Sequence, residues 1–133
     1  MNKKDREFAG ITHLVNIVPL WGLVFNGVIW YIFKDKSKYV VFNAIQSIFF
    51  HLFFLTVMII GIAFQVFIML IKLLLSQIGS LLEFGNWTVM MVFFTVYILT
   101  CILGAWRIFN GEDFLYPFIG KRLTKEFSTK EEE

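Results

Sequence analysis

The sequence contains 133 residues, of which 58% are hydrophobic and 17% are charged, and its formal net charge is +2. Soluble domains average about 45–50% apolar and about 25% charged residues, so a soluble chain of this size cannot bury this much apolar surface. The composition excludes a soluble enzyme domain and a disordered segment. It also excludes a disulfide-stapled secreted module, since Cys101 is the single cysteine. It predicts one integral membrane domain.

Charged residues divide the chain into three long uncharged runs, which are residues 8–33, 39–71 and 84–106. Each run exceeds the about 20 residues that a helix needs to cross the hydrocarbon core, and none alternates as a barrel strand does. We therefore predict an all-α integral membrane protein with three transmembrane helices plus an amphipathic helix. The three spans are expected at about 10–33, 40–63 and 86–106. They belong to a membrane domain over 9–122, between a polar N-terminus (1–8) and a charged flexible tail (123–133).

The first run contains Pro19 and Gly22 near its middle. Proline removes a backbone donor and clashes with the preceding turn, so we expect a kink or a break there. A re-entrant hairpin that turns at Pro19 is the alternative to a full span. The run is longer than the apolar stretch of a signal peptide, which argues against a cleaved leader.

The amphipathic helix is expected at about 65–83. Its polar residues recur at spacings of seven, four, four and three, as on one face of a helix, and they are Gln65, Lys72, Ser76, Ser80 and Glu83. Such a helix can lie at the membrane surface or continue the second span beyond it. Alternatively, its polar face packs against the other spans.

After the third span, Asn110-Gly111 predicts a helix end, and Phe114, Tyr116 and Phe118 beside Lys121 and Arg122 suit the membrane interface. With three spans the two chain ends lie on opposite sides of the membrane. Basic residues number four in the N-terminus and the 64–85 segment, against eight in the first loop and the tail. The positive-inside rule then puts the tail in the cytoplasm, in a multi-pass protein of the cell membrane.

Polar side chains within the spans are the candidate site, because they are costly in lipid. On a helical wheel they form one stripe on the first span and one on the second, and the candidate residues are Asn16, Asn26, Asn43, Gln46, Ser47 and His51. The stripes can meet and hydrogen-bond between helices, which is the structural interpretation. The functional interpretation is the lining of a polar cavity or solute path.

No catalytic, cofactor-binding or metal-binding residues are expected. The sequence lacks Gly-x-Ser-x-Gly, His-Glu-x-x-His and P-loop motifs, and no basic patch of the size that binds nucleic acid is present. His13 and His51 stand at different expected depths and do not suggest a haem pair. The expected partners are the lipid bilayer and either other membrane subunits or further copies of the chain.

Three blocks of sequence resemble a known family. They are Thr12-His13-Leu14 with Pro19-Leu20 and Ile29-Trp30, then Val41-Phe42-Asn43-Ala44-Ile45-Gln46-Ser47, and Asn110-Gly111-Glu112 with Tyr116-Pro117-Phe118. In this order they are similar to the small DUF4870-type membrane proteins, which are related to the Tic20-like chloroplast import subunit and to MamF-like magnetosome proteins. The histidine and the arginine of that pattern are replaced here by Asn43 and Leu115.

The resemblance implies a small helical membrane protein within a larger assembly and implies no known reaction. We therefore expect a non-enzymatic accessory or scaffold subunit that acts through helix packing with itself or with a partner complex. Two alternatives stay open. One is a translocation or permeation component that uses the polar stripes, as in the Tic20-like relatives. The other is a membrane-surface sensor or remodeller that uses residues 65–83 and the tail.

Overall fold

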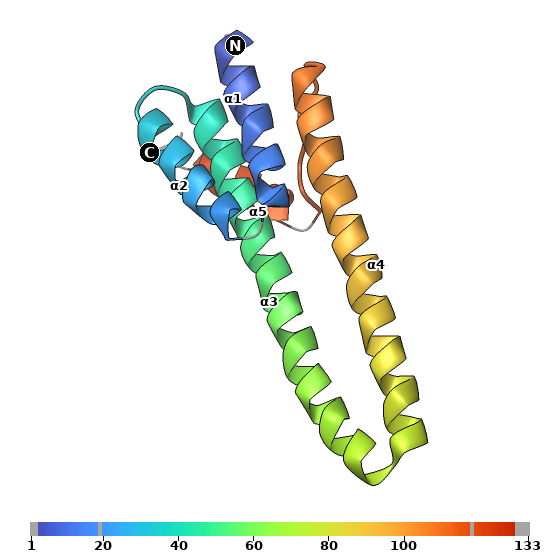
Figure 1. Cartoon of the computed structure of the whole chain (residues 1–133). Coiled ribbons are helices and arrows are strands. Elements are labelled where there is room, and N and C mark those ends of the chain that lie inside the picture. The colour runs from blue at the N-terminus through green and yellow to red at the C-terminus, as the bar shows by residue number, and fades with distance from the viewer. Residues whose placement is uncertain (1–2, 19, 118, 130–133) are drawn as a thin grey trace. The chain divides into compact units, whose positions relative to one another are not determined.

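The structure is a computed structural model that describes residues 3–18, 20–117 and 119–129, with side chains described as far as Thr124. These residues form helices and contain no strand, which confirms the all-α prediction (Figure 1). The elements are α1 (Lys3–Leu14), η1 (Val15–Ile17), α2 (Trp21–Phe33), α3 (Lys38–Leu74), α4 (Ser76–Phe109) and α5 (Ile119–Thr129). The chain divides into two compact units, one of residues 53–99 and the other of the residues on either side of them.

Helices α3 and α4 are the two helices long and apolar enough to cross a membrane among the described residues. They contain 37 and 34 residues, or about 55 and 51 Å at about 1.5 Å per residue. Only 11% and 28% of their most apolar windows are buried. The core helix of a soluble protein would be mostly buried, so these helices fit a lipid environment better.

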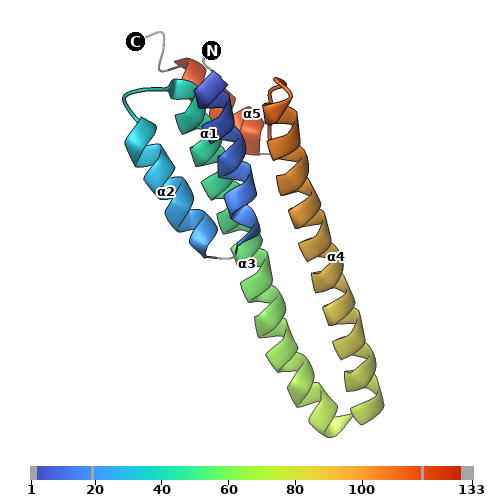
Figure 2. The ribbon, with the colours of Figure 1, turned by 45° about the horizontal axis from the view of Figure 1, so that its top comes forward.

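The first apolar run forms a helical hairpin, which differs from the expected single span over 10–33. Helix α1 ends at Leu14, the short η1 follows, and α2 runs back beside α1 (Figures 1 and 2). With 13 residues, α2 is about 20 Å long, which is less than a span needs. The expected break is therefore present, and the chain reverses at Leu20, whose φ is +64°. Pro19 itself lies outside the described residues.

The expected amphipathic helix over 65–83 is not formed either. Helix α3 continues to Leu74 and α4 begins at Ser76, so the polar stripe is divided between two helices. The Lys72 ammonium donates to the Glu83 carboxylate over 2.6 Å across this hairpin. In one continuous helix these opposite charges would lie about 16 Å apart along the axis. Unpaired charges beside lipid are costly, so the reversal that pairs them is favoured.

The unit of residues 53–99 is the hairpin of α3 and α4. Its helices contact through aromatic rings, with Phe54 stacked on Tyr97 at 3.8 Å and on Phe93 at 5.9 Å between ring centroids. Toward the turn, Gly79 lets α4 approach the backbone of Lys72, where a Cβ would collide. The hairpin is therefore held at both ends by specific contacts.

The other unit, called the network unit here, contains α1, η1, α2 and α5 with the adjoining ends of α3 and α4. Its apolar core contains Ala9, Ile108, Phe114 and Tyr116. Helix α4 ends as predicted at Asn110-Gly111, where Gly111 takes a φ of +92°, a conformation that glycine adopts without strain. The next residues return into the network unit and lead to α5.

Candidate functional site: a buried polar network

All six residues of the predicted polar stripes lie in the network unit, and each has at most 2% of its surface exposed. Asn16 is on η1 and Asn26 is on α2, whereas the other four are on the first part of α3. Asn43, Gln46 and Ser47 lie on one face of α3, because residues three and four apart are neighbours on a helix. The break between α1 and α2 brings Asn16 and Asn26 together beside that face.

Asn16 joins the two stripes. Its side-chain amide donates to the carbonyl of Ser47 over 3.0 Å, and its Oδ1 accepts from the amide of Asn26 over 2.7 Å. His51 forms a further hydrogen bond with the backbone of Asn16. The structure thus brings the two stripes into contact, and Asn16 of the first stripe hydrogen-bonds to residues of the second.

His13 is the centre of the network, although it is not one of the predicted site residues. Its Nε2 lies 3.1 Å from Oδ1 of Asn43, and its Nδ1 lies 2.8 Å from the hydroxyl of Tyr116. Because Oδ1 only accepts, Nε2 carries the proton in this arrangement, and Nδ1 is free to accept from the tyrosine. A neutral imidazole therefore satisfies both contacts at once.

The side chain of Gln46 forms two hydrogen bonds with the backbone of the returning C-terminal segment. Its Nε2 donates to the carbonyl of Phe114 over 3.0 Å, and its Oε1 accepts from the backbone N–H of Tyr116 over 3.0 Å. Both backbone groups are buried and would otherwise lack partners in an apolar core. One side chain on α3 thus fixes the register of an extended segment that is about 70 residues away in sequence.

The ring of Tyr116 is also packed in the core. It stacks on Phe50 with ring centroids 3.9 Å apart, and its own surface is 1% exposed. Gly104 and Gly120 leave the space for this segment, because a Cβ on Gly104 would be 2.8 Å from the Phe114 ring. A Cβ on Gly120 would be 2.6 Å from Oε1 of Gln46. Phe114 and Tyr116, which were expected at the membrane interface, are therefore core residues. Phe118, which was expected there too, lies outside the described residues.

Sequence reasoning missed His13 and Tyr116 because their contact joins residues 103 positions apart. Helical periodicity concerns one helix at a time and carries no information about such a contact. A signal was nevertheless present. His13, Asn43, Gln46, Ser47 and Tyr116 all belong to the three blocks that carry the family resemblance, and the structure brings those three blocks together.

The chemistry of this network is that of neutral hydrogen bonding. Its members are amides, hydroxyls and imidazoles, and the described residues contain no group of three or more His, Cys, Asp or Glu that could hold a metal ion. Oδ1 of Asn26 is buried without a hydrogen-bond partner, whereas the amide nitrogen of the same residue is paired. Such networks specify how helices pack, and each bond between membrane helices contributes about 0.6–2 kcal/mol.

Comparison with known proteins points to one family. A family model described as the magnetosome magnetite crystal formation protein family (MamF/MmsF) matches residues 4–123. No curated protein and no solved structure matches the chain. The match supports the MamF-like part of the resemblance and leaves the DUF4870-type and Tic20-like parts without support.

Proposed function

We propose that this chain, which belongs to the magnetosome magnetite crystal formation protein family, is an accessory or scaffold subunit of a membrane. Membership in this family suggests a non-enzymatic, membrane-associated role. The proposal adds that the protein acts through helix packing with itself or with a partner complex and catalyses no reaction. One observation carries it: the polar groups are used inside the network unit, while the long helices present apolar surface outward.

The inward use of polar groups is visible in the candidate residues themselves. Gln46, Asn16 and Asn43 each hydrogen-bond to other parts of the network unit and are at most 2% exposed. A permeation path needs such groups to face a solute. Amide groups that already hold helices and backbone together favour the scaffold over a translocation component.

The outward apolar surface is extensive. Large hydrophobic side chains on α3 and α4 are more than half exposed, and examples are Ile59, Phe67, Val92 and Leu99. Lipid covers such surface, and so does the helix of another membrane protein. Packing between membrane helices gains from close contact and small residues rather than from the hydrophobic effect. The surface is therefore suited to lipid and to partner helices alike.

The proposal also includes a topology with both termini in the cytoplasm. The residues up to Leu52 and those from Thr100 belong to the same compact unit, and Ser37 donates to Asp5 within it over 2.9 Å. Lys72 is the single basic residue between Lys38 and Arg107. With α3 and α4 as the two crossings, nearly all Lys and Arg lie on one side, as the positive-inside rule requires of the cytoplasmic side.

The test is a pull-down of the tagged full-length protein from its native membrane in mild detergent, combined with crosslinking in cells and mass spectrometry. A partner recovered at constant stoichiometry, or crosslinks between two copies of the chain, is the expected result. An unrelated membrane protein with the same tag is the control. Recovery of a monomer without partners from native membranes would contradict the proposal.

A further inference from the structure

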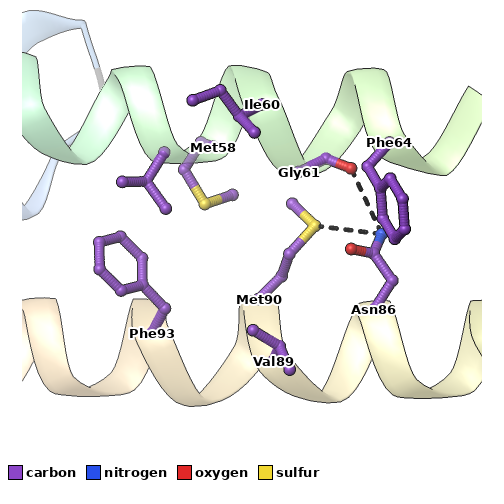
Figure 3. A pocket seen from close by; sticks show the side chains of 9 residues that line it. Met58, Ile60, Gly61, Phe64, Asn86, Val89, Met90 and Phe93 are labelled. Atoms are coloured by element: carbon purple, nitrogen blue, oxygen red, sulfur yellow. Dashed lines mark hydrogen bonds between the residues drawn. The ribbon is translucent and has the colours of Figure 1, made fainter.

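The hairpin of α3 and α4 contains a groove within the unit of residues 53–99. It has a volume of about 250 Å³ and lies between the two helices (Figure 3). Its walls include Met58, Phe64, Met90 and Phe93. In Figure 3 the methionine side chains point into the space between the helices, and Phe93 and Phe64 stand toward its two ends.

Gly61 of α3 lines the groove, and the Met90 side chain packs directly on it. A Cβ on Gly61 would be 2.9 Å from the sulfur of Met90, so a larger residue there would displace the Met90 side chain within the groove. The stacked pair of Phe54 and Phe93 keeps α3 and α4 together next to the groove. Methionine is flexible and polarizable, so the Met58 and Met90 side chains can adjust to an apolar occupant of irregular shape.

Asn86 is the one polar side chain in the wall, and its amide nitrogen already has hydrogen-bond partners. The amide nitrogen of Asn86 donates to Oε1 of Gln65 over 2.8 Å, to the carbonyl of Gly61 over 3.3 Å, and approaches the sulfur of Met90 at 3.8 Å (Figure 3). A ligand that needs this donor would have to break these contacts. The other eight lining residues are apolar or glycine, so the wall suits a hydrocarbon chain.

We propose that this groove binds one acyl chain of a membrane phospholipid. Atoms that line an unfilled apolar space lose dispersion contacts on one side, and a dry cavity of roughly 150 Å³ is enough to bind benzene. In a membrane the abundant apolar molecule beside α3 and α4 is the lipid chain itself. A second copy of the chain fits less well, because a helix is about 10 Å wide and cannot enter a groove of this volume.

This binding site goes beyond the proposed scaffold role and rests only on the membrane placement of α3 and α4. The probe is a phosphatidylcholine with a diazirine midway along one acyl chain, added at low fraction to phosphatidylcholine vesicles that contain the full-length protein. Irradiation and mass spectrometry then locate the labelled residues. We expect labelling to concentrate on Met58, Met90 and their neighbours in the groove.

Two variants that fill or cover the groove test the assignment. Gly61→Leu places a side chain in the groove, and Val89→Phe enlarges a wall residue that is 68% exposed and therefore has room for the change. Gly85→Leu is the matched control, because a Cβ on Gly85 has no other atom within 4 Å. Labelling in the groove should be lost in the first two variants and retained in the control, with helical content by circular dichroism unchanged.

Three results would overturn the proposal. Labelling spread evenly over the exposed faces of α3 and α4 would indicate ordinary boundary lipid. Groove labelling that persists in both folded variants would show that the chain binds elsewhere. Crosslinks from the groove to a second copy of the protein would assign it to self-association. The result of the pull-down does not change any of these labelling outcomes. Each of the two proposals can therefore be contradicted without the other.

Discussion

His13 connects the first helix to the C-terminal segment through its two ring nitrogens. Asn43 accepts from one nitrogen, and the hydroxyl of Tyr116 binds the other over 2.8 Å. The ring of Tyr116 has an independent contact through its stacking on Phe50. Hydrogen bonding and packing at Tyr116 can therefore be separated by substitution.

Tyr116→Phe should lower the stability of the protein by about 1 kcal/mol, because it removes the 2.8 Å hydrogen bond and leaves the buried Nδ1 of His13 only the longer contact with Oγ of Ser47 at 3.5 Å. The measurement is the thermal unfolding midpoint in mild detergent. Tyr31→Phe is the control, since Tyr31 is 65% exposed. Equal midpoints for the two variants would contradict the role assigned to the buried hydroxyl.

Gly120→Ala should destabilise the docked C-terminal segment by about 1–3 kcal/mol. The new methyl group would be 2.6 Å from Oε1 of Gln46 and 2.7 Å from Cβ of Leu115, so both neighbours must move. The measurement is the rate of limited proteolysis between residues 110 and 120.

Gly27→Ala is the matched control for that substitution, because a Cβ there meets nothing within 4 Å. Alanine favours a helix by about 0.5–1 kcal/mol over glycine, so this variant should be slightly stabilised. Faster cleavage in Gly27→Ala than in Gly120→Ala would argue against a tightly packed contact at Gly120.

Among the elements, the α3–α4 hairpin shows where pattern and structure diverge. The spacing of Gln65, Lys72, Ser76, Ser80 and Glu83 is that of one helical face, yet the chain reverses at Leu75. The same spacing of polar residues arises in one continuous helix and in two antiparallel helices whose polar positions face each other. The spacing alone therefore does not distinguish the two arrangements. The pairing of Lys72 with Glu83 is an interaction between two helices, which a pattern along a single helix does not reveal.

Lys72→Glu should weaken the hairpin, because it places two carboxylates face to face. The double variant Lys72→Glu with Glu83→Lys should recover most of the loss. Their side chains are 46% and 32% exposed, so the coupling expected from a double-mutant cycle is about 0.2–1 kcal/mol in detergent. Thermal unfolding of the four proteins measures it, and a coupling of zero would show that the pair does not stabilise the turn.

At the scale of the whole molecule, the number of membrane crossings decides where the termini lie. Three spans would separate them, whereas the structure puts the N-terminal and C-terminal segments in one unit and leaves two helices of spanning length in the described residues. In the proposed topology with two crossings, the α1–α2 hairpin enters and leaves on the same side. Whether the number of crossings is odd or even depends on the whole folded chain, and no single run of residues reveals it.

Reporters fused to the two ends should therefore give the same result. Alkaline phosphatase, active only outside the cytoplasm, should be inactive at either terminus, and a fluorescent protein that folds in the cytoplasm should be bright at both. A phosphatase inserted after Leu75 should be active. Opposite signals from the two termini would restore the three-span topology.

Local features of the sequence were enough to predict the class of the protein. Composition and uncharged runs predicted helices in a membrane, Pro19 and Gly22 predicted the break that separates α1 from α2, and helical spacing identified the buried polar residues from Asn16 to His51. These features depend on residues close together in the chain, where hydrophobicity, backbone restriction and helical period act locally.

The tertiary structure alone decided how these parts meet. Two contacts join segments that are distant in sequence, namely the docking of Tyr116 on His13 and the pairing of Gln46 with the backbone of Phe114. A third feature, the reversal at Leu75, joins two helices that run in opposite directions. Burial decides the first two, because a polar group removed from both water and lipid must find a partner wherever the fold supplies one. Local patterns identify which groups need partners, and only packing selects the partner.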